Sequence, residues 1–292
     1  MNKNGILYRI CRKCYHIVHN IFYPFGYIRN YIIFPIKAFL RTKGIICKKQ
    51  NAAIKEVKDI HKGKRCFVLA TGPSLKVEDV EALEEEITIA VNSFYKIYEK
   101  TEFRPTYYAV LDPDVQSTVI ANSTVPLNEL SKSKVFMNDM QRDKIDGIVY
   151  LPLCYQDHWF NVFNEKYNFE QNLRKTTDLL WGIYDKYTIT NAAIEIAIYM
   201  GCTEIYLLGV DCNYNGPQNY FAKPDKGTFT PNEFQASMTQ KAMMTGYRFM
   251  ERETRKQGIR VFNATRGGML EEFERVNFDD LKLGGNDNDN AE

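Results

Sequence analysis

A turn that follows a short apolar run carries residue types that could bind a phosphate group. The run is residues 66–70, and the turn is Thr71, Gly72, Pro73 and Ser74. Glycine lets the backbone approach a ligand closely, and proline suits the first turn of a helix. A serine hydroxyl beside the free N–H groups of a helix N-terminus can bind an anion. The turn therefore predicts the front of a nucleotide site, with an ordinary strand-to-helix turn as the alternative.

This turn differs from two common phosphate-binding motifs. It has neither the six-position glycine pattern of dinucleotide-binding proteins nor the Gly-Lys-Ser/Thr ending of a phosphate loop. Both of those families are therefore disfavoured.

Polar, turn-forming residues also end several other apolar runs of the chain. Neutral hydrogen-bonding groups of this kind, with few cations among them, suit a sugar nucleotide whose base and ribose take hydrogen bonds. Each residue alone could be a strand cap, a turn residue or a core aromatic, so the evidence is their joint position. Besides the turn, the residues collected at these ends are Asn92, Ser93, Asp112, Asp211, Tyr214, Asn263 and Thr265.

Strands and helices alternate along the part of the chain that would position these residues. Apolar runs predict strands at 66–70, 87–91, 106–111, 135–137, 147–151, 204–211 and 259–264. A short helix and a turn are expected over 54–63, and helical patterns cover 77–86, 190–200, 232–257 and 270–281. This alternation indicates an α/β fold with a mostly parallel, Rossmann-like sheet and helices on both faces. In such a sheet, ligands collect at the carboxyl ends of the strands.

Composition divides the chain into a basic segment, a main domain and a tail. The chain has 38 Lys or Arg and 36 Asp or Glu, and residues 1–65 hold 15 of the basic but only two of the acidic residues. We expect 1–60 to be a basic, aromatic segment for membrane contact or docking, and 61–281 to be the nucleotide-sugar-binding catalytic domain. Residues 154–174 are aromatic and polar with no clear period, and we expect a lid over the site at about 152–186. The polar residues 282–292 are expected to be a disordered tail.

The basic segment combines large apolar side chains with the cations Arg29, Lys37, Arg41 and Lys43. None of its uncharged runs is long enough to span a bilayer, and Pro24 and Pro35 are expected to interrupt any single helix. Residues 1–50 therefore predict an interfacial contact with an anionic membrane surface, or packing on the chain's own domain or another subunit. No secretory signal pattern is present, so we expect a cytoplasmic protein at the inner face of the membrane. We expect no nucleic-acid partner, and a homo-oligomer stays open.

The seven cysteines favour neither disulfides nor a metal site. Their number is odd, and several lie inside apolar runs, where a free cysteine behaves as a small hydrophobe. Cys11 and Cys14 form one CxxC pair without a second pair, which chance spacing explains better than zinc. We therefore predict no metal-binding residues.

Three motifs together resemble two related groups of bacterial proteins. They are Gly72-Pro73-Ser74-Leu75, Asn92-x-Phe94-Tyr95 and Gly201-x-x-Glu204-Ile205-Tyr206-Leu207-x-Gly209-x-Asp211. The first group is the sialyltransferases of glycosyltransferase family 42. The second is the family of 6-hydroxymethylpterin diphosphokinase-like proteins, which includes the motility accessory factors that glycosylate flagellin. The resemblance covers roughly residues 65–281 and implies a GT-A-like variant of the fold.

For the sialyltransferases, the resemblance implies residues that bind a cytidine monophosphate (CMP) sugar. Gly72, Pro73 and Ser74 would meet its ribose and phosphate, and Asn92 and Asp112 would lie alongside it. The predicted nucleotide-binding set also includes Thr71, Ser93, Thr188, Asp211, Asn263 and Thr265.

The same resemblance implies groups that stabilise the phosphate as it leaves. Tyr214 and Tyr220 have the six-residue spacing of two tyrosines of the family, in a register shifted by one position. Lys186 and Thr188 stand where the family has an arginine and then a threonine. Lys186 would therefore be the cation near the phosphate, with weaker geometry than a guanidinium.

The general base of the family is a histidine, and this chain departs from the family there. The matching residues 233–240 contain no histidine. Proton removal from a sugar hydroxyl requires a base within hydrogen-bond reach. His158 could approach from the variable middle of the chain, and Asp157, Asp112 and Glu233 are substitutes.

The leading hypothesis is a glycosyltransferase peripheral to the membrane. It would move a sialic-acid-like or related sugar from a CMP donor to a glycan or glycolipid acceptor in surface polysaccharide synthesis. Because the leaving group is a phosphate whose charge Tyr214, Tyr220 and Lys186 would stabilise, no cofactor or metal is required.

Two other hypotheses come from different classes of protein. A 6-hydroxymethylpterin diphosphokinase would use ATP and Mg²⁺, with Asp112, Asp114 and Asp211 as candidate metal ligands. A non-catalytic nucleotide-sugar-binding partner would lack a general base. Metal dependence separates the first two hypotheses, and measurable turnover separates both from the third.

Overall fold

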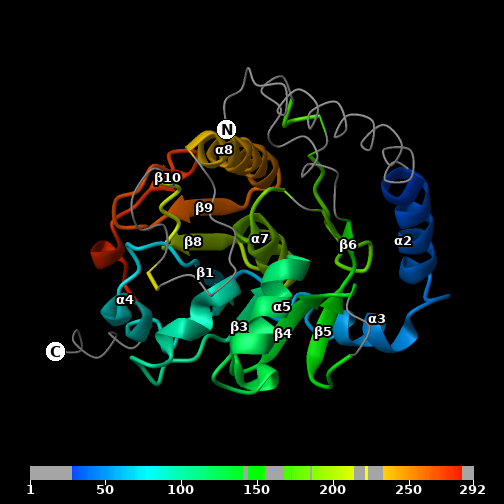
Figure 1. Ribbon diagram of the computed structural model, residues 1–292, viewed down its shortest axis with the longest axis horizontal. Helices are drawn as coiled ribbons and strands as arrows, with labels where there is room; N and C mark the ends of the chain where they lie inside the picture. The colour runs from blue at the N-terminus through cyan, green and yellow to red at the C-terminus, as the bar shows by residue number, and fades with distance from the viewer. Residues whose placement is uncertain are drawn as a thin grey trace, which may run out of the picture.

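The apolar runs expected to be strands form one sheet in the computed structural model (Figure 1). The structure describes residues 28–140, 144–154, 168–171, 173–184, 186–213, 221–222 and 233–284. The strands of the main sheet are β1 (Arg65–Leu69), β2 (Thr88–Val91), β3 (Tyr107–Val110), β4 (Lys134–Asn138), β5 (Ile148–Leu151), β8 (Glu204–Leu208), β9 (Arg260–Asn263) and β10 (Glu274–Arg275). Each pair of neighbours runs parallel, in the order β10-β9-β8-β1-β2-β3-β4-β5. The predicted α/β fold with a parallel sheet is confirmed.

Helices cover both faces of this sheet, and alternate side chains of each strand pack toward one face or the other. On β1, Cys66 and Val68 pack with α7 (Ile189–Tyr199) and the inner side of α8 (Glu233–Arg255). Phe67 and Leu69 pack on the opposite face with α4 (Val77–Glu81), the 3₁₀ turn η2 (Asn92–Ile97) and α5 (Pro113–Asn122). The strands are therefore buried on both sides, as their continuous apolar runs predict.

The strand order creates a topological switch point between β1 and β8. From β1 the chain proceeds through β2 and β3 toward β5, and it returns on the other side of β1 as β8 (Figure 1). The register pairs Leu69 with Leu208, so the two strands end level with each other. Ligands of open parallel sheets bind beyond the carboxyl ends of the strands at such a point.

Two helix predictions are wrong in their extent. The helix expected over 270–281 is replaced by β10 and a 3₁₀ turn, η4 (Phe278–Asp280). Arg275 stabilises this extended path, because its guanidinium donates to the carbonyls of Thr265 (3.1 Å), Gly267 (2.7 Å) and Leu270 (3.1 Å). The other helix, α4, ends at Glu81 instead of 86. The short helix and turn expected over 54–63 are present, but the helix, α3 (Lys48–Lys55), lies earlier in the chain, and turns follow it up to Gly63.

The turns after α3 are held by the end of α7. The amide of Asp59 donates to the carbonyl of Tyr199 (3.1 Å), and the amide of His61 donates to that of Met200 (2.7 Å). These bonds use backbone groups that a helix over 54–63 would satisfy internally.

The N-terminal part of the described chain is helical, and Pro35 does not interrupt it as expected. A π-helical turn, η1 (Arg29–Ile33), leads directly into α2 (Phe34–Thr42), with the amide of Phe34 bonded to the carbonyl of Arg29. Pro35 fits because it stands in the first turn of α2, after a π turn that relaxes the usual hydrogen-bond pattern. The predictions for Pro24, Cys11, Cys14 and residues 285–292 lie outside the described residues.

The expected lid region contributes a second, two-stranded parallel sheet of β6 (Leu153–Cys154) and β7 (Ile183–Tyr184). Helix α2 packs beside this sheet, and α3 lies next to β5 (Figure 1). In the part of the chain that is described, none of the helices has the length and apolar character needed to cross a membrane.

Candidate functional site

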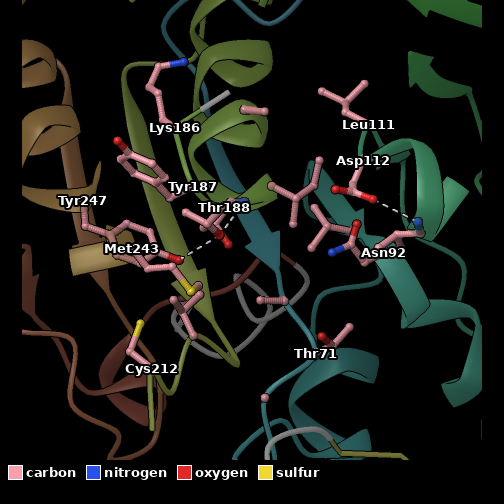
Figure 2. Close-up of a pocket in the computed structure, with 18 of the residues that line it drawn as sticks. Thr71, Asn92, Leu111, Asp112, Lys186, Tyr187, Thr188, Cys212, Met243 and Tyr247 are labelled. Atoms are coloured by element: carbon pink, nitrogen blue, oxygen red, sulfur yellow. Dashed lines mark hydrogen bonds between the residues drawn. The ribbon is translucent and has the colours of Figure 1, made fainter. Parts of the chain in front are cut away.

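A cavity of about 300 Å³ lies at the carboxyl ends of β1, β2, β3 and β8. The first turn of α7, one side of α8 and strands β6 and β7 complete its walls (Figure 2). It occupies the switch point between β1 and β8, where the sheet topology leads us to expect a ligand. Seven of the predicted site residues line it: Thr71, Gly72, Asn92, Asp112, Lys186, Thr188 and Asp211.

Five other predicted residues lie near the cavity but not in its described lining. Pro73 is exposed, and Ser93 is half-buried in η2. Asn263 at the end of β9 and Thr265 just after it are buried beside β8. The Thr265 hydroxyl accepts from the amide of Val210 (3.1 Å), and the Asn263 carboxamide accepts from the amide of Thr265 (3.0 Å). They therefore support the loop after β8. The fifth residue, Ser74, contacts that loop directly.

The turn after β1 is fastened to the loop after β8 through Gly72, Ser74 and Asp211. The Ser74 hydroxyl and amide both donate to Oδ2 of Asp211, at 2.8 and 3.3 Å. A Cβ atom on Gly72 would lie 1.9 Å from that same oxygen and 2.4 Å from the carbonyl oxygen of Gly209. Only glycine fits this approach. Burial raises the pKa of the Asp211 carboxyl, and the hydrogen bonds from Ser74 oppose that shift.

Ser74 does not stand at a helix N-terminus as expected. The amide of Leu75 bonds to the carbonyl of Gly72 (3.2 Å), which closes a turn, and α4 begins only at Val77. The predicted contact of Ser74 with a phosphate stays a prediction, because its hydroxyl is engaged by Asp211 in this structure.

Three residues of the cavity wall have a left-handed backbone that is rare outside glycine. The φ angles are +52° at Asn92, +66° at Tyr187 and +53° at Cys212, and all three residues line the cavity. Within the described chain, only two further non-glycine residues, Cys47 and Asp59, share this conformation. Each such residue costs about 1–3 kcal/mol and persists only where its surroundings enforce it, often at functional sites.

Asn92 presents an unsatisfied acceptor beside the cavity. Its carboxamide oxygen is buried and has no hydrogen-bond partner among the residues that the structure describes. Its backbone is fixed by Tyr108, whose fully buried hydroxyl donates to the Asn92 carbonyl and accepts from the amide of Tyr95 (3.1 Å). A buried acceptor without a partner is costly unless a ligand or water satisfies it, so this oxygen suits a ligand donor group.

Asp112 lies next to Asn92 in the cavity wall (Figure 2). Its Oδ1 caps α5 by accepting from the amides of Asp114 (2.9 Å) and Val115 (3.0 Å). Asp112 followed by Pro113 is a sequence signal for the start of a helix. The signal was not used, so α5 was not among the predicted helices.

The opposite wall comes from the junction of α7 with α8. Thr188 caps α7 through the amide of Thr190 (3.3 Å), and its hydroxyl lies 3.3 Å from that of Tyr247. Burial raises the pKa of Tyr247, so its hydroxyl stays protonated and can act as a donor. Thr239 and Met243 precede Tyr247 at intervals of four residues on the same face of α8.

Sequence reasoning missed several residues of this lining. The four-residue spacing on α8 was a signal, but methionines and aromatics at that spacing usually indicate core. Nothing in the sequence indicates the left-handed conformations of Tyr187 and Cys212, because tyrosine and cysteine do not favour a positive φ. The missed polar, aromatic and sulfur-containing residues are Tyr184, Tyr187, Thr190, Cys212, Asn213, Thr239, Met243 and Tyr247.

Lys186 already has a partner for its charge. Its side chain is fully buried, and Nζ donates to Oε2 of Glu195 (2.7 Å) and to the carbonyl of Tyr184 (2.8 Å). Figure 2 shows the ammonium directed away from Thr188. Burial raises the pKa of Glu195, and the cation of Lys186 opposes that shift. To meet a phosphate, the ammonium would have to leave Glu195, so its predicted role stays a prediction.

The predicted residues His158, Tyr214 and Tyr220 lie outside the described residues, as does Asp157. In the ranges that the structure describes, no group of three or more His, Cys, Asp or Glu side chains is arranged to hold a metal ion.

Comparisons with known proteins give one family and several solved structures. A family model described as 6-hydroxymethylpterin diphosphokinase MptE-like matches residues 46–217. The MAf glycosyltransferase from Magnetospirillum magneticum AMB-1 is similar with 17% identity and a TM-score of 0.46, over 81% of this chain and 39% of that one. This chain therefore spans well under half of that protein. No curated protein matches the chain.

The sialyltransferase CstII from Campylobacter jejuni is also similar. Its complex with cytidine-5'-monophosphate shows 16% identity and a TM-score of 0.42, over 74% of this chain and 85% of that one. Its complex with CMP-3FNeuAc shows 14% identity and a TM-score of 0.38, over 73% and 86%.

Proposed function

The chain belongs to the 6-hydroxymethylpterin diphosphokinase MptE-like family, one of the two groups that its motifs resemble, and we propose that it is a glycosyltransferase. The proposed reaction moves a sialic-acid-like or related sugar from a CMP donor to a glycan or glycolipid acceptor in surface polysaccharide synthesis. The observation that carries this proposal is the cavity at the switch point, which three residues with left-handed backbones surround and where Asn92 offers an unsatisfied acceptor.

In this proposal the donor nucleotide lies along the turn after β1. The buried carboxamide oxygen of Asn92 accepts a hydrogen bond from an amino or hydroxyl group of the nucleotide. The hydroxyls of Thr188 and Tyr247 face the cavity from the other side and can donate to the sugar or phosphate. Tyr214 and Tyr220 keep their predicted role at the leaving phosphate.

Transfer breaks the bond between the anomeric carbon and a phosphate oxygen, and CMP leaves with the bonding electrons. The acceptor hydroxyl forms the new bond and loses its proton to a base. Asp112 and Asp211 are the carboxylates of the described lining. We assign the base to Asp112, which is among the bases expected from the sequence and lies beside Asn92 in the cavity wall (Figure 2). Asp211 instead connects the loop after β8 to the turn after β1 through Ser74.

A thermal-shift panel of CMP, CDP, UDP, GDP and ATP, each with and without Mg²⁺, tests the donor. We expect CMP to raise the melting temperature without Mg²⁺, because a ligand that binds only the folded state stabilises it. If only ATP with Mg²⁺ raises the melting temperature, and CMP does not, the proposal is wrong. Release of CMP from a CMP-sialic acid then separates an enzyme from a non-catalytic binding partner.

The description of the matching family favours a second candidate, a pterin diphosphokinase that uses ATP and Mg²⁺. Two carboxylates of the described lining, Asp112 and Asp211, could hold its metal, because proteins usually bind Mg²⁺ through one or two carboxylates together with substrate phosphates. In this structure each of them accepts two hydrogen bonds within the protein. We derive no step through magnesium, and the ATP arm of the panel tests this candidate.

A further inference from the structure

An apolar stripe faces outward along η1 and α2. We call it the outer stripe; its members, with their exposed fractions, are Ile28 (43%), Ile32 (47%), Ile33 (42%), Ile36 (55%) and Phe39 (52%). The opposite side of the same helix is buried through Asn30, Ala38 and Arg41. The helix therefore has its isoleucines on the exposed side, whereas an ordinary surface helix has its apolar residues on the buried side.

Contacts with the rest of the protein fix this orientation. The guanidinium of Arg41 donates to the carbonyls of Leu180 (3.0 Å) and Trp181 (2.8 Å), and Arg41 is only 4% exposed. Phe34 fills the space beside Gly182, where an added Cβ would lie 2.6 Å from its ring. A rotation of the helix that buried the outer stripe would break these contacts of Arg41 and Phe34.

The surroundings of the outer stripe are basic. Arg29, Lys37 and Lys43 are exposed on the same helix or just after it, and the ammonium of Lys43 lies 5.7 Å from the centre of the Phe39 ring. No Asp or Glu occurs in the sequence before Glu56. A cationic surface around the outer stripe is complementary to an anionic bilayer. The lipid headgroups attract the cations, and the isoleucines can insert at the boundary between headgroups and acyl chains.

We propose that the outer stripe binds the surface of an anionic bilayer, with η1 and α2 lying in the plane of the interface. The cavity is linked to this surface, because α2 packs on the turn that leads into β7, and Ile183 and Tyr184 of β7 line the cavity. Membrane binding would thus hold the cavity close to a lipid-carried acceptor. Only this consequence rests on the proposed function.

Co-sedimentation of the full chain with vesicles tests the proposal. The vesicles are phosphatidylcholine alone or phosphatidylcholine mixed with phosphatidylglycerol. We expect the chain to sediment with the mixed vesicles, less at high salt, and weakly with the neutral ones. The double variant Ile36→Ser/Phe39→Ser should bind at least about tenfold more weakly, because it removes two large apolar side chains from the interface. Ile60→Ser is the matched control, since Ile60 is 47% exposed but lies in the turns after α3.

Three results would overturn the proposal. They are no sedimentation of the wild type with mixed vesicles, equal sedimentation of the double variant, or a wild-type dimer that the double variant converts to monomer. The last result would assign the stripe to a second copy of the chain. The CMP thermal shift of the same variants, measured without vesicles, should be unchanged. A failure of the proposed function would remove that shift from every variant and leave vesicle binding intact.

Discussion

Gly72 is the residue at which the turn after β1 touches the loop after β8. We expect Gly72→Ala to unfold about 1–3 kcal/mol more easily and to lose most of the CMP thermal shift, because its methyl group overlaps Asp211 and the Gly209 carbonyl. Urea unfolding measures the first effect. Gly284→Ala is the control, since its Cβ would lie 3.5 Å from Glu86 in ordinary contact. Equal stability of Gly72→Ala and the wild type would contradict the close approach.

Asp112 has two separable roles, as the cap of α5 and as the proposed base. Asn is as good a cap as Asp, so Asp112→Asn should keep the fold and the CMP shift. An amide cannot take the acceptor proton, and we expect CMP release from CMP-sialic acid to fall at least about 100-fold. Asp114→Asn, in the first turn of the same helix, should be as active as the wild type. Wild-type turnover in Asp112→Asn would refute the assignment of the base.

The sequence predicted that polar residues would lie at the strand ends, but not which of them would face the cavity. Asn92, Asp112 and Asp211 were expected together because parallel strands end at one edge, and the structure brings them to one cavity. Asn263 and Thr265 share that sequence context but are buried as supports for the loop after β8. Whether a polar residue at a strand end faces a ligand or a neighbouring loop depends on strand order, which the residue alone does not contain.

At the scale of elements, long segments with a strong apolar pattern were predictable. Helix α7 and strands β1 and β8 lie within one to three residues of their expected ends. The segment 270–281 was misjudged, because Arg275 can satisfy the carbonyls of an irregular path as a helix would satisfy its own. Helix propensity is a weak preference that such tertiary contacts override.

The junction between β7 and α7 depends on the buried pair of Lys186 and Glu195. We expect Lys186→Met to destabilise the protein by about 3–5 kcal/mol, because it leaves a buried carboxylate without its cation. The double variant Lys186→Met/Glu195→Gln should recover most of that loss, since the glutamine can still accept from the amide of Thr176. Urea unfolding of the two variants measures the difference.

The same double variant tests the predicted role of Lys186 at the phosphate. We expect it to keep the CMP thermal shift, because the ammonium is buried and bonded to Glu195. Loss of the shift in a stable double variant would instead establish that Lys186 reaches the donor.

At the scale of the whole molecule, the order of the strands is what assembles the site. Strands β1 and β8 are more than 130 residues apart in the chain, yet they are neighbours in the sheet, and this places Asp211 against Gly72. The sequence indicated both strands and a parallel sheet, but many strand orders satisfy the same alternation. The uneven distribution of charge was likewise visible in the sequence, while the outward direction of the outer stripe along η1 and α2 required the contacts of Arg41.

The C-terminal edge of the sheet is joined to the rest of the molecule by Arg266. Its guanidinium donates to both carboxylate oxygens of Asp79 in α4 (2.7 and 2.8 Å) and to Asp279 in η4 (2.8 Å), and these bonds raise its pKa. The side chain of Asp79 is only 8% exposed. Arg266→Met therefore leaves a nearly buried carboxylate without a partner, and we expect a loss of about 1–3 kcal/mol in urea unfolding.

Arg255→Met is the matched control for this prediction. Arg255 also pairs with an acid, Glu251 at 3.3 Å, but its side chain is 77% exposed, and such pairs contribute at most about 1 kcal/mol. If Arg266 were an ordinary surface cation, the two variants would lower the unfolding midpoint by the same amount. A larger loss in Arg266→Met is expected because its guanidinium joins three segments that are distant in sequence: the loop after β9, α4 and η4. Repeating the unfolding at high salt strengthens the comparison, since screening weakens the exposed pair more than the one formed with Asp79.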